Sequence, residues 1–221
     1  MSRAPILFLA CLVLAGPAWA QKGGIKLPPP AVSGKTSAEE VIHNRRSVRE
    51  FSDAPLTLAE AGQLLWAAQG VTEKTRGFRS APSAGAIYPL RTYLAAERVS
   101  GLPRGIYLYS PSKHSLILVK AEGGAPLLEG VASQGFVAAA PLSVILAADH
   151  TAIKKRYKER AERYTNMEAG HAAQNFHLQA EALGLGSVAV GSFSDAALHR
   201  AAAMTAGEVP LYILPAGRKP R

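Results

Sequence analysis

The sequence predicts an α+β fold in one domain, with a central, mostly antiparallel sheet flanked by helices. Two helix-capping signatures, Ser37-Ala-Glu-Glu40 and Thr57-Leu-Ala-Glu60, predict helices in the first third of the chain. Short β-prone runs separated by glycine and proline follow, and a long helical stretch comes after them. Helices and strands therefore occur without the regular alternation expected of a parallel sheet.

The helical segments are defined by their apolar spacing and by their ends. The first is expected to run from Ser37 through Arg45, and the second from Thr57 to a stop at Gly70. The longest helix is expected over residues 151–183, before Gly184 and Gly186, and a short one over 195–203.

The predicted strands lie between these helices. Residues 92–96, 106–109 and 115–119 indicate a hairpin-rich stretch, and 188–190 and 209–214 are two later strands. Residues 142–148 form an almost continuous apolar run, which is typical of a central strand covered on both faces.

The first 20 residues have the pattern of a secretory signal peptide. Arg3 precedes an apolar run over residues 5–15, and Ala18-Trp19-Ala20 supplies the cleavage pattern. The alternative is an uncleaved membrane anchor, but a run of about ten residues is too short to span a bilayer. We expect an exported, periplasmic or secreted protein, with an extended linker over residues 21–36 and the domain over 37–221.

Cysteine and charge limit the classes of function. Cys11 is the only cysteine and lies in the signal, so the mature chain lacks a thiol nucleophile, a disulfide framework and a cysteine metal site. Loss of Arg3 leaves 24 basic against 16 acidic residues, a net charge of +8. Such a balance favours phosphorylated cofactors, nucleic acid or anionic lipid without choosing among them.

Arg45, Ser47 and Arg49 form the first candidate site. If they end a helix, Arg45 and Arg49 lie on one face with the Ser47 hydroxyl between them. Two guanidinium groups and a hydroxyl suit a phosphate monoester. The alternative is a solvated basic helix end, which is favourable against the helix dipole.

Two glycine-bearing loops form the other candidates. Residues 82–89 and 184–192 offer bare backbone to a flat ligand, although each could also be an ordinary turn. Ser187 and Ser192 lack the G-x-S-x-G pattern of a nucleophile, and neither G-x-G-x-x-G nor a P-loop occurs. His171 and His177 lack metal-ligand spacing, so we expect no metal.

Five motifs in order resemble the nitroreductase superfamily, and most closely its SagB/ThcOx-type azoline-oxidase-like branch. They are R-R-S-x-R-x-F from Arg45, P-S-A-G-A-I-Y-P from Pro82, Y-K-E-R-A-E-R-Y-x-x-M-E-A-G-H-A-A-Q-N from Tyr157, A-L-G-L-G-S-V-A-V-G-S-F from Ala182 and P-L-Y-I-L-P-A-G-R from Pro210. The similarity covers residues 37–218. Single motifs are loose, whereas five in order are specific.

The resemblance implies an FMN-dependent, nitroreductase-like fold that forms a homodimer with two FMN molecules at its interface. It implies that the phosphate and ribityl chain are held near the mature start, that one loop lies against the isoalloxazine, and that a second backbone segment contacts its N5/O4 edge. The corresponding residues are Arg45, Arg46, Ser47 and Arg49 for the phosphate and ribityl chain, with Arg218 as a further phosphate contact, Ser83, Ala84, Gly85 and Ala86 for the ring, and Gly191 and Ser192 for N5/O4.

The expected activity is that of an oxidoreductase passing hydride through flavin N5 to or from a small organic molecule, such as a nitroaromatic or quinone. NAD(P)H or another donor would supply electrons, and we expect neither nucleic acid nor stable membrane insertion. No catalytic side chain is assigned, although Tyr157 and Tyr164 are expected to line the substrate channel. Azoline-oxidising relatives have a Lys-Tyr pair where this chain has Arg156-Tyr157, and arginine does not act as a base.

Two alternatives stay open. One is a scaffold that binds flavin or an anion without turnover, and the other is a basic exported module that binds polyanions. By default, the basic run KKRYKER is interpreted as a solvated face.

Overall fold

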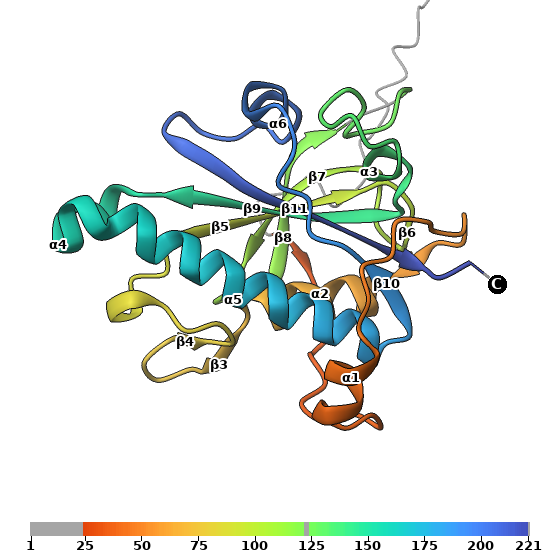
Figure 1. The fold of residues 1–221 in the computed structure, drawn as a ribbon, viewed down its shortest axis with the longest axis horizontal. Helices are drawn as coiled ribbons and strands as arrows, with labels where there is room; N and C mark the ends of the chain where they lie inside the picture. The colour runs from red at the N-terminus through yellow and green to blue at the C-terminus, as the bar shows by residue number, and fades with distance from the viewer. Residues whose placement is uncertain (1–23, 122–123, 221) are drawn as a thin grey trace, which may run out of the picture.

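A seven-stranded sheet crosses the middle of the computed structural model, which describes residues 24–121 and 124–220 (Figure 1). The strand order is β1-β8-β7-β5-β9-β11-β10, and every neighbouring pair is antiparallel. The strands are β1 (Ile25–Lys26), β5 (Leu90–Ala96), β7 (Gly105–Ser110), β8 (Ser115–Ala121), β9 (Leu142–Asp149), β10 (Leu185–Ser187) and β11 (Glu208–Arg218). This sheet confirms the predicted fold class.

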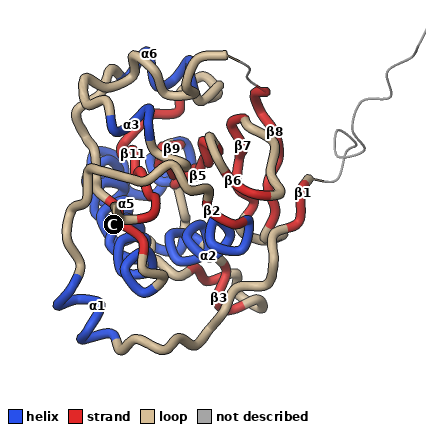
Figure 2. The backbone as a smooth tube through the Cα atoms, turned by 90° about the vertical axis from the view of Figure 1, so that its right-hand side faces the viewer, coloured by secondary structure: helices blue, strands red, loops and turns tan. Residues whose placement is uncertain are grey.

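Helices cover both faces of this sheet. Helices α2 (Leu58–Gln69) and α5 (Ala161–Ala182) pack on one face with apolar residues of β5, β9 and β11. The opposite face packs against α3 (Phe136–Ala139), α6 (Asp195–Ala201) and the loops beside them (Figure 1). Helix α1 (Ala38–Asn44) packs against α5, away from the sheet (Figure 2).

Short pairings lie outside the main sheet. Strand β2 (Leu56–Thr57) pairs in parallel with β6 (Val99–Ser100), and β3 (Val71–Glu73) forms a hairpin with β4 (Phe78–Arg79). The β3–β4 hairpin leads into the loop before β5, which carries one of the candidate ligand contacts.

Both capping signatures begin helices, as predicted. Thr57 and Glu60 form the complete reciprocal box, because Thr57 N donates to Glu60 Oε2 at 2.8 Å and Glu60 N donates to Thr57 Oγ1 at 3.2 Å. At α1, Ser37 Oγ accepts from Glu40 N at 3.1 Å. Helix α2 ends at Gly70, and the apolar run over 142–148 is fully buried in β9, between β5 and β11.

Three expected elements differ from the structure. The helix predicted over 151–183 is divided into α4 (Thr151–Tyr157), a 3₁₀ turn (Lys158–Arg160) and α5, with Lys158 at φ 48°. The strand predicted over 188–190 lies three residues earlier, as β10, and Val190 makes only one bridge, to Ile213. The short helix α6 ends at Ala201, not at residue 203.

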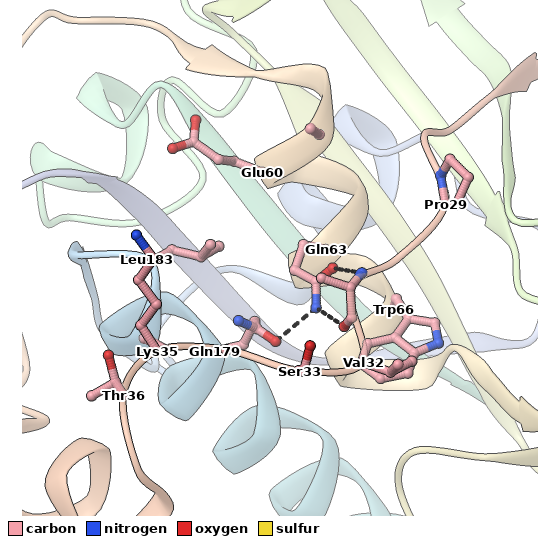
Figure 3. Close-up of a pocket in the computed structure, with 14 residues that line it drawn as sticks. Pro29, Val32, Ser33, Lys35, Thr36, Glu60, Gln63, Trp66, Gln179 and Leu183 are labelled. Carbon is pink, nitrogen blue, oxygen red and sulfur yellow. Dashed lines mark hydrogen bonds between the residues drawn. The ribbon is translucent and has the colours of Figure 1, made fainter.

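The lead-in before α1 is extended, but it is packed on the domain, and order begins well before Ser37. Strand β1 pairs with β8 at the sheet edge (Figure 2), and Leu27 is buried in the core. Gln63 holds Ala31 through both backbone groups and also donates to Gln179 at 2.9 Å (Figure 3). The lead-in thereby covers a cavity of about 450 Å³ against α2 and α5.

The expected signal peptide lies outside the described residues. Among the helices of residues 24–121 and 124–220, none combines the length and apolar character needed to cross a bilayer.

Candidate functional site

The Arg45–Arg49 segment is not helical, so the helix-face reason for grouping its arginines is wrong. Helix α1 ends at Asn44, and Ser47 instead forms a parallel bridge with Ser187, next to the 3.0 Å bond from Val48 N to Ser187 O. Alternate side chains of a strand-like segment share a side. This geometry groups Arg45, Ser47 and Arg49 opposite Val48.

Val48 anchors this segment on β10. A Cβ placed on Gly186 would lie 2.6 Å from Val48 Cγ1, so glycine is what allows the two backbones to approach. Arg45 is half-buried and Arg49 exposed, and neither forms an ion pair with a described residue. Two arginines without a carboxylate partner are suited to an exogenous anion.

Arg46 and Arg218, also predicted to contact the cofactor, already have partners. Arg46 Nη1 donates to the carbonyls of His43 and Arg45 at 2.8 Å each, closing the end of α1. Arg218 Nη1 lies 2.8 Å from Glu60 Oε1, within the capping box of α2. Part of the donor capacity of each guanidinium is therefore already used within the chain.

A buried histidine lies beneath the arginine segment. His177 Nδ1 is 2.8 Å from Ser187 Oγ, and burial, followed by the charge of Arg45, lowers the pKa of His177 to about 4. The imidazole is therefore neutral near pH 7 and supports Ser187, which holds Ser47 and Val48. The sequence did not indicate that His177 supports Ser187, because His177 has no motif of its own and its burial depends on tertiary packing.

A strained loop forms the second part of the site. Ala84–Ala86 is a 3₁₀ turn in which Gly85 has φ 61° and Ala86 has φ 54°. Tyr88, two residues after the turn, also has φ 54°. Positive φ is unfavourable for residues other than glycine and is found most often at functional sites. The loop is held because Tyr88 N donates to Ser83 Oγ at 2.9 Å and Arg79 N donates to Tyr88 Oη at 3.1 Å.

Glu168 is buried behind this loop. Its side chain lies on the inner face of α5, and neither carboxylate oxygen has a hydrogen-bond partner at ordinary distances among the described residues. Burial raises the pKa of Glu168 to about 7, against the opposing effects of Ser83, Arg79 and Gln69. The carboxyl group was not predicted as a site residue, although it lies in the E-A-G-H motif.

The Arg156-Tyr157 pair, at the end of α4, packs against the Ser83–Ala86 loop. A Cβ on Gly85 would be 2.7 Å from Arg156 Nη1 and 2.8 Å from Tyr157 Oη. Tyr157 also meets the Tyr164 ring edge-on, with centroids 5.0 Å apart. The structure thus brings Tyr157 to the Ser83–Ala86 loop and packs Tyr164 against Tyr157.

The predicted contacts form separate groups in one chain. The arginine segment lies beside His177 in the second half of α5, whereas the Ser83–Ala86 loop lies beside Glu168. Nine helical residues span about 14 Å, which suits an elongated ligand with an anionic end and a flat end. Gly191 and Ser192 are exposed beyond β10, and Ser192 lines a shallow hollow with residues 130–133.

Within the described residues, no three His, Cys, Asp or Glu side chains are grouped closely enough to hold a metal ion. The chemistry available from side chains is anion binding by arginine and a carboxyl group that titrates near neutrality. A redox group would have to come from a bound cofactor.

The position of Val48 gives a test of how tightly the segment is held. Gly186→Ala is expected to destabilise the fold by about 1–3 kcal/mol, because the added methyl overpacks against Val48. Urea unfolding followed by circular dichroism measures this. Gly170→Ala is the matched control, since its Cβ meets nothing within 4 Å on exposed α5, and the same change there should stabilise by up to about 1 kcal/mol. Equal effects of the two changes would contradict close packing at Gly186.

Comparisons with known proteins agree with the fold. Residues 42–218 match the model of the nitroreductase family. A Methanocaldococcus jannaschii protein provisionally named as a nitroreductase (MJ1384) is 43% identical over 182 residues, covering 82% of this chain and 90% of the relative. A crystal structure from Ralstonia eutropha JMP134, also provisionally named as a nitroreductase, has a TM-score of 0.79 at 31% identity and covers 89% of this chain and 90% of its own.

A more distant neighbour shares the fold alone. A chain of the Escherichia coli microcin synthetase McbBCD complex superposes with a TM-score of 0.67 at 21% identity, covering 97% of this chain and 85% of that one.

Proposed function

Because the chain belongs to the nitroreductase family, we propose that this oxidoreductase binds FMN and passes hydride through flavin N5 to a small organic acceptor such as a nitroaromatic or quinone. The flavin supplies the redox chemistry, and the protein supplies binding, orientation and electrostatics. With a quinone as acceptor, the bound flavin would supply the hydride and water would supply the remaining proton.

The absence of described carboxylate partners for Arg45 and Arg49 is the observation that carries this proposal. Their positive charges lie on either side of the Ser47 hydroxyl, which together offer several donors to a phosphate dianion. Toward the other end of α5, the ring would lie against the Ser83–Ala86 loop, where the missing Cβ of Gly85 lets the Arg156 and Tyr157 side chains lie directly on the loop backbone.

The remaining contacts complete the proposed cradle. Ser83, Ala84 and Ala86 would lie against the ring, and Gly191 and Ser192 would offer backbone groups to its N5 edge. Arg46 and Arg218 already donate to the end of α1 and to Glu60, so we assign the phosphate mainly to Arg45 and Arg49.

We also propose a homodimer, formed through the helical side of the molecule. Ile42 on α1 and Met167 on the outer face of α5 are large apolar side chains that are 61% and 54% exposed. A second copy covering this side would bury both. Size-exclusion chromatography with light scattering gives the mass directly.

Export and the SagB-type branch also belong to this proposal. The signal pattern supports export, and the P-S-A-G and E-A-G-H motifs support the branch, whereas Arg156 in place of lysine argues against azoline oxidation. An exported enzyme would draw on NAD(P)H or on a different electron donor.

Titration of the purified mature protein with FMN tests the cofactor. We expect quenching of flavin fluorescence, bleaching of the bound flavin by dithionite or NAD(P)H, and recovery of colour when a quinone is added. A colourless protein after incubation with FMN would refute the proposal. Bound flavin that never reoxidises with any acceptor would favour the non-catalytic scaffold, and salt-sensitive retention on a polyanion column without flavin would favour the polyanion-binding module.

A further inference from the structure

Six basic residues are concentrated where α4 joins α5, against only two acidic ones in the same ten-residue stretch. All six are exposed, and none forms an ion pair with a described residue. We call this group the basic rim. It consists of Lys154, Lys155, Arg156, Lys158, Arg160 and Arg163.

The basic rim is not simply a solvated helix face, because it borders the proposed ring site. Arg156 Nη1 reaches within 2.7 Å of the position of a Gly85 Cβ, and its guanidinium carbon lies 5.4 Å from the centre of the Tyr157 ring. Helix α4 extends beyond the N-terminal end of α5 (Figure 1), so the rim lies at one end of the proposed cradle.

The acidic groups near this rim are fewer than its basic ones. Glu159 and Glu162 lie within the rim, and Asp149, at the start of α4, accepts from Thr151 N at 2.9 Å, a contact that lowers its pKa and keeps it ionised. Glu168 is buried, and its raised pKa keeps about half of the carboxyl groups protonated near pH 7. Arg79 adds a further positive charge behind the loop, stacked on Tyr88 at 4.6 Å.

We propose that Arg156 and the basic rim select acceptors that are both aromatic and anionic, such as molecules carrying a carboxylate or sulfonate. This inference rests on the proposed function and names its substrate class. The planar guanidinium matches a carboxylate or sulfonate in a two-pronged contact, and the Tyr157–Tyr164 pair offers an aromatic surface beside it. The other rim charges raise the local concentration of anions at low salt.

Matched acceptors test the selectivity. The quantity to compare is kcat/KM for 4-nitrobenzoate divided by kcat/KM for methyl 4-nitrobenzoate. We expect this ratio to fall about tenfold from the native enzyme to Arg156→Gln, as for one lost hydrogen bond to a charged group. Arg200→Gln on α6, across the sheet, should leave the ratio unchanged. Arg156→Lys keeps the positive charge but loses the planar guanidinium, so its ratio should lie between those of the native enzyme and Arg156→Gln.

An equilibrium measurement separates this inference from the proposed function. Calorimetry with benzoate, and with neutral benzamide as its control, needs no turnover. We expect binding of benzoate that weakens in Arg156→Gln and in high salt, and no comparable binding of benzamide.

The two proposals can therefore fail independently. Bound, reduced flavin that is reoxidised by neither nitro compound nor a quinone would overturn the proposed function, whereas benzoate binding lost in Arg156→Gln would still support an anion site at Arg156. Equal selectivity ratios in native enzyme and Arg156→Gln, or benzoate binding unchanged by that substitution, would overturn the inference.

Discussion

Replacing Arg45 and Arg49 together with alanine is expected to weaken FMN binding by about 100-fold or more while leaving the fold intact. A hydrogen bond to a charged group contributes about 1.5–3 kcal/mol, and the double change removes at least two of them from the phosphate. Neither arginine has an ion-pair partner among the described residues, so their loss removes no ion pair from the fold. Fluorescence-quench titration gives the affinity, and circular dichroism melting reports the fold.

Arg46→Ala provides the contrasting variant. Its guanidinium closes α1 through two carbonyls, so we expect a lower Tm with a small change in FMN affinity. If the double variant binds FMN as tightly as the native protein, the phosphate is held elsewhere, and Arg46 and Arg218 become the remaining candidates. A melting profile without a cooperative transition would instead show that the arginine segment is needed for folding.

Local signals in the sequence predicted most of the fold. The reciprocal Thr57–Glu60 box and the Gly70 stop lie within one helix, and the apolar run of β9 reflects burial on both faces. Such features depend on neighbours along the chain, so the sequence alone contains them.

Elements that depend on tertiary partners were misplaced. Strand β10 is defined by its pairing with residues 216–218 of β11 and by Val48 packed on Gly186, neither of which is local. The break at Lys158 falls inside a run with ordinary helical composition. The lead-in was predicted to be an extended linker, but Leu27 and the Gln63–Ala31 bonds attach it to the domain.

The candidate site shows the same division. The motifs selected the arginine segment and the Ser83–Ala86 loop as candidates, but the i, i+4 spacing of Arg45 and Arg49 suggested a helix where the segment is strand-like. Glu168 and His177 were missed because their importance comes from burial. A polar residue at an inward position of an otherwise apolar helix face is the one signal that could have identified them.

Glu168→Gln is expected to stabilise the protein relative to the native chain, by an amount that grows as the pH rises from about 5 to about 8. The pKa of Glu168 is about 7 in the folded state against 4.5 for an exposed glutamate. Below the lower value the carboxyl is protonated in both states. Between the two values only the unfolded chain ionises, so native stability falls, and above the upper value the loss is complete. The gap corresponds to about 3 kcal/mol.

The effect of Glu168 has to be separated from that of His177, whose titration changes stability in the opposite direction. The difference in free energy of unfolding between the native protein and Glu168→Gln makes this separation. With its pKa lowered to about 4, His177 contributes stability that is fully present above about 6.5 and is lost as the pH falls toward 4. That contribution is common to both chains and cancels. Urea unfolding at pH 5, 6, 7 and 8 gives the difference, with Glu162→Gln on the exposed side of the same helix as the flat control.

The Ser83 hydroxyl connects this titration to the site. Ser83 lowers the pKa of Glu168, so Ser83→Ala in the native chain should raise the pH range over which stability is lost. The same substitution in Glu168→Gln should cause no such shift. Parallel stability profiles for native protein and Glu168→Gln across the whole range would show that the carboxyl titrates as it does in water. A growing difference would place a neutral, protonated carboxyl directly behind the loop proposed to face the flavin, where the ionised form would oppose the charge of a reduced ring.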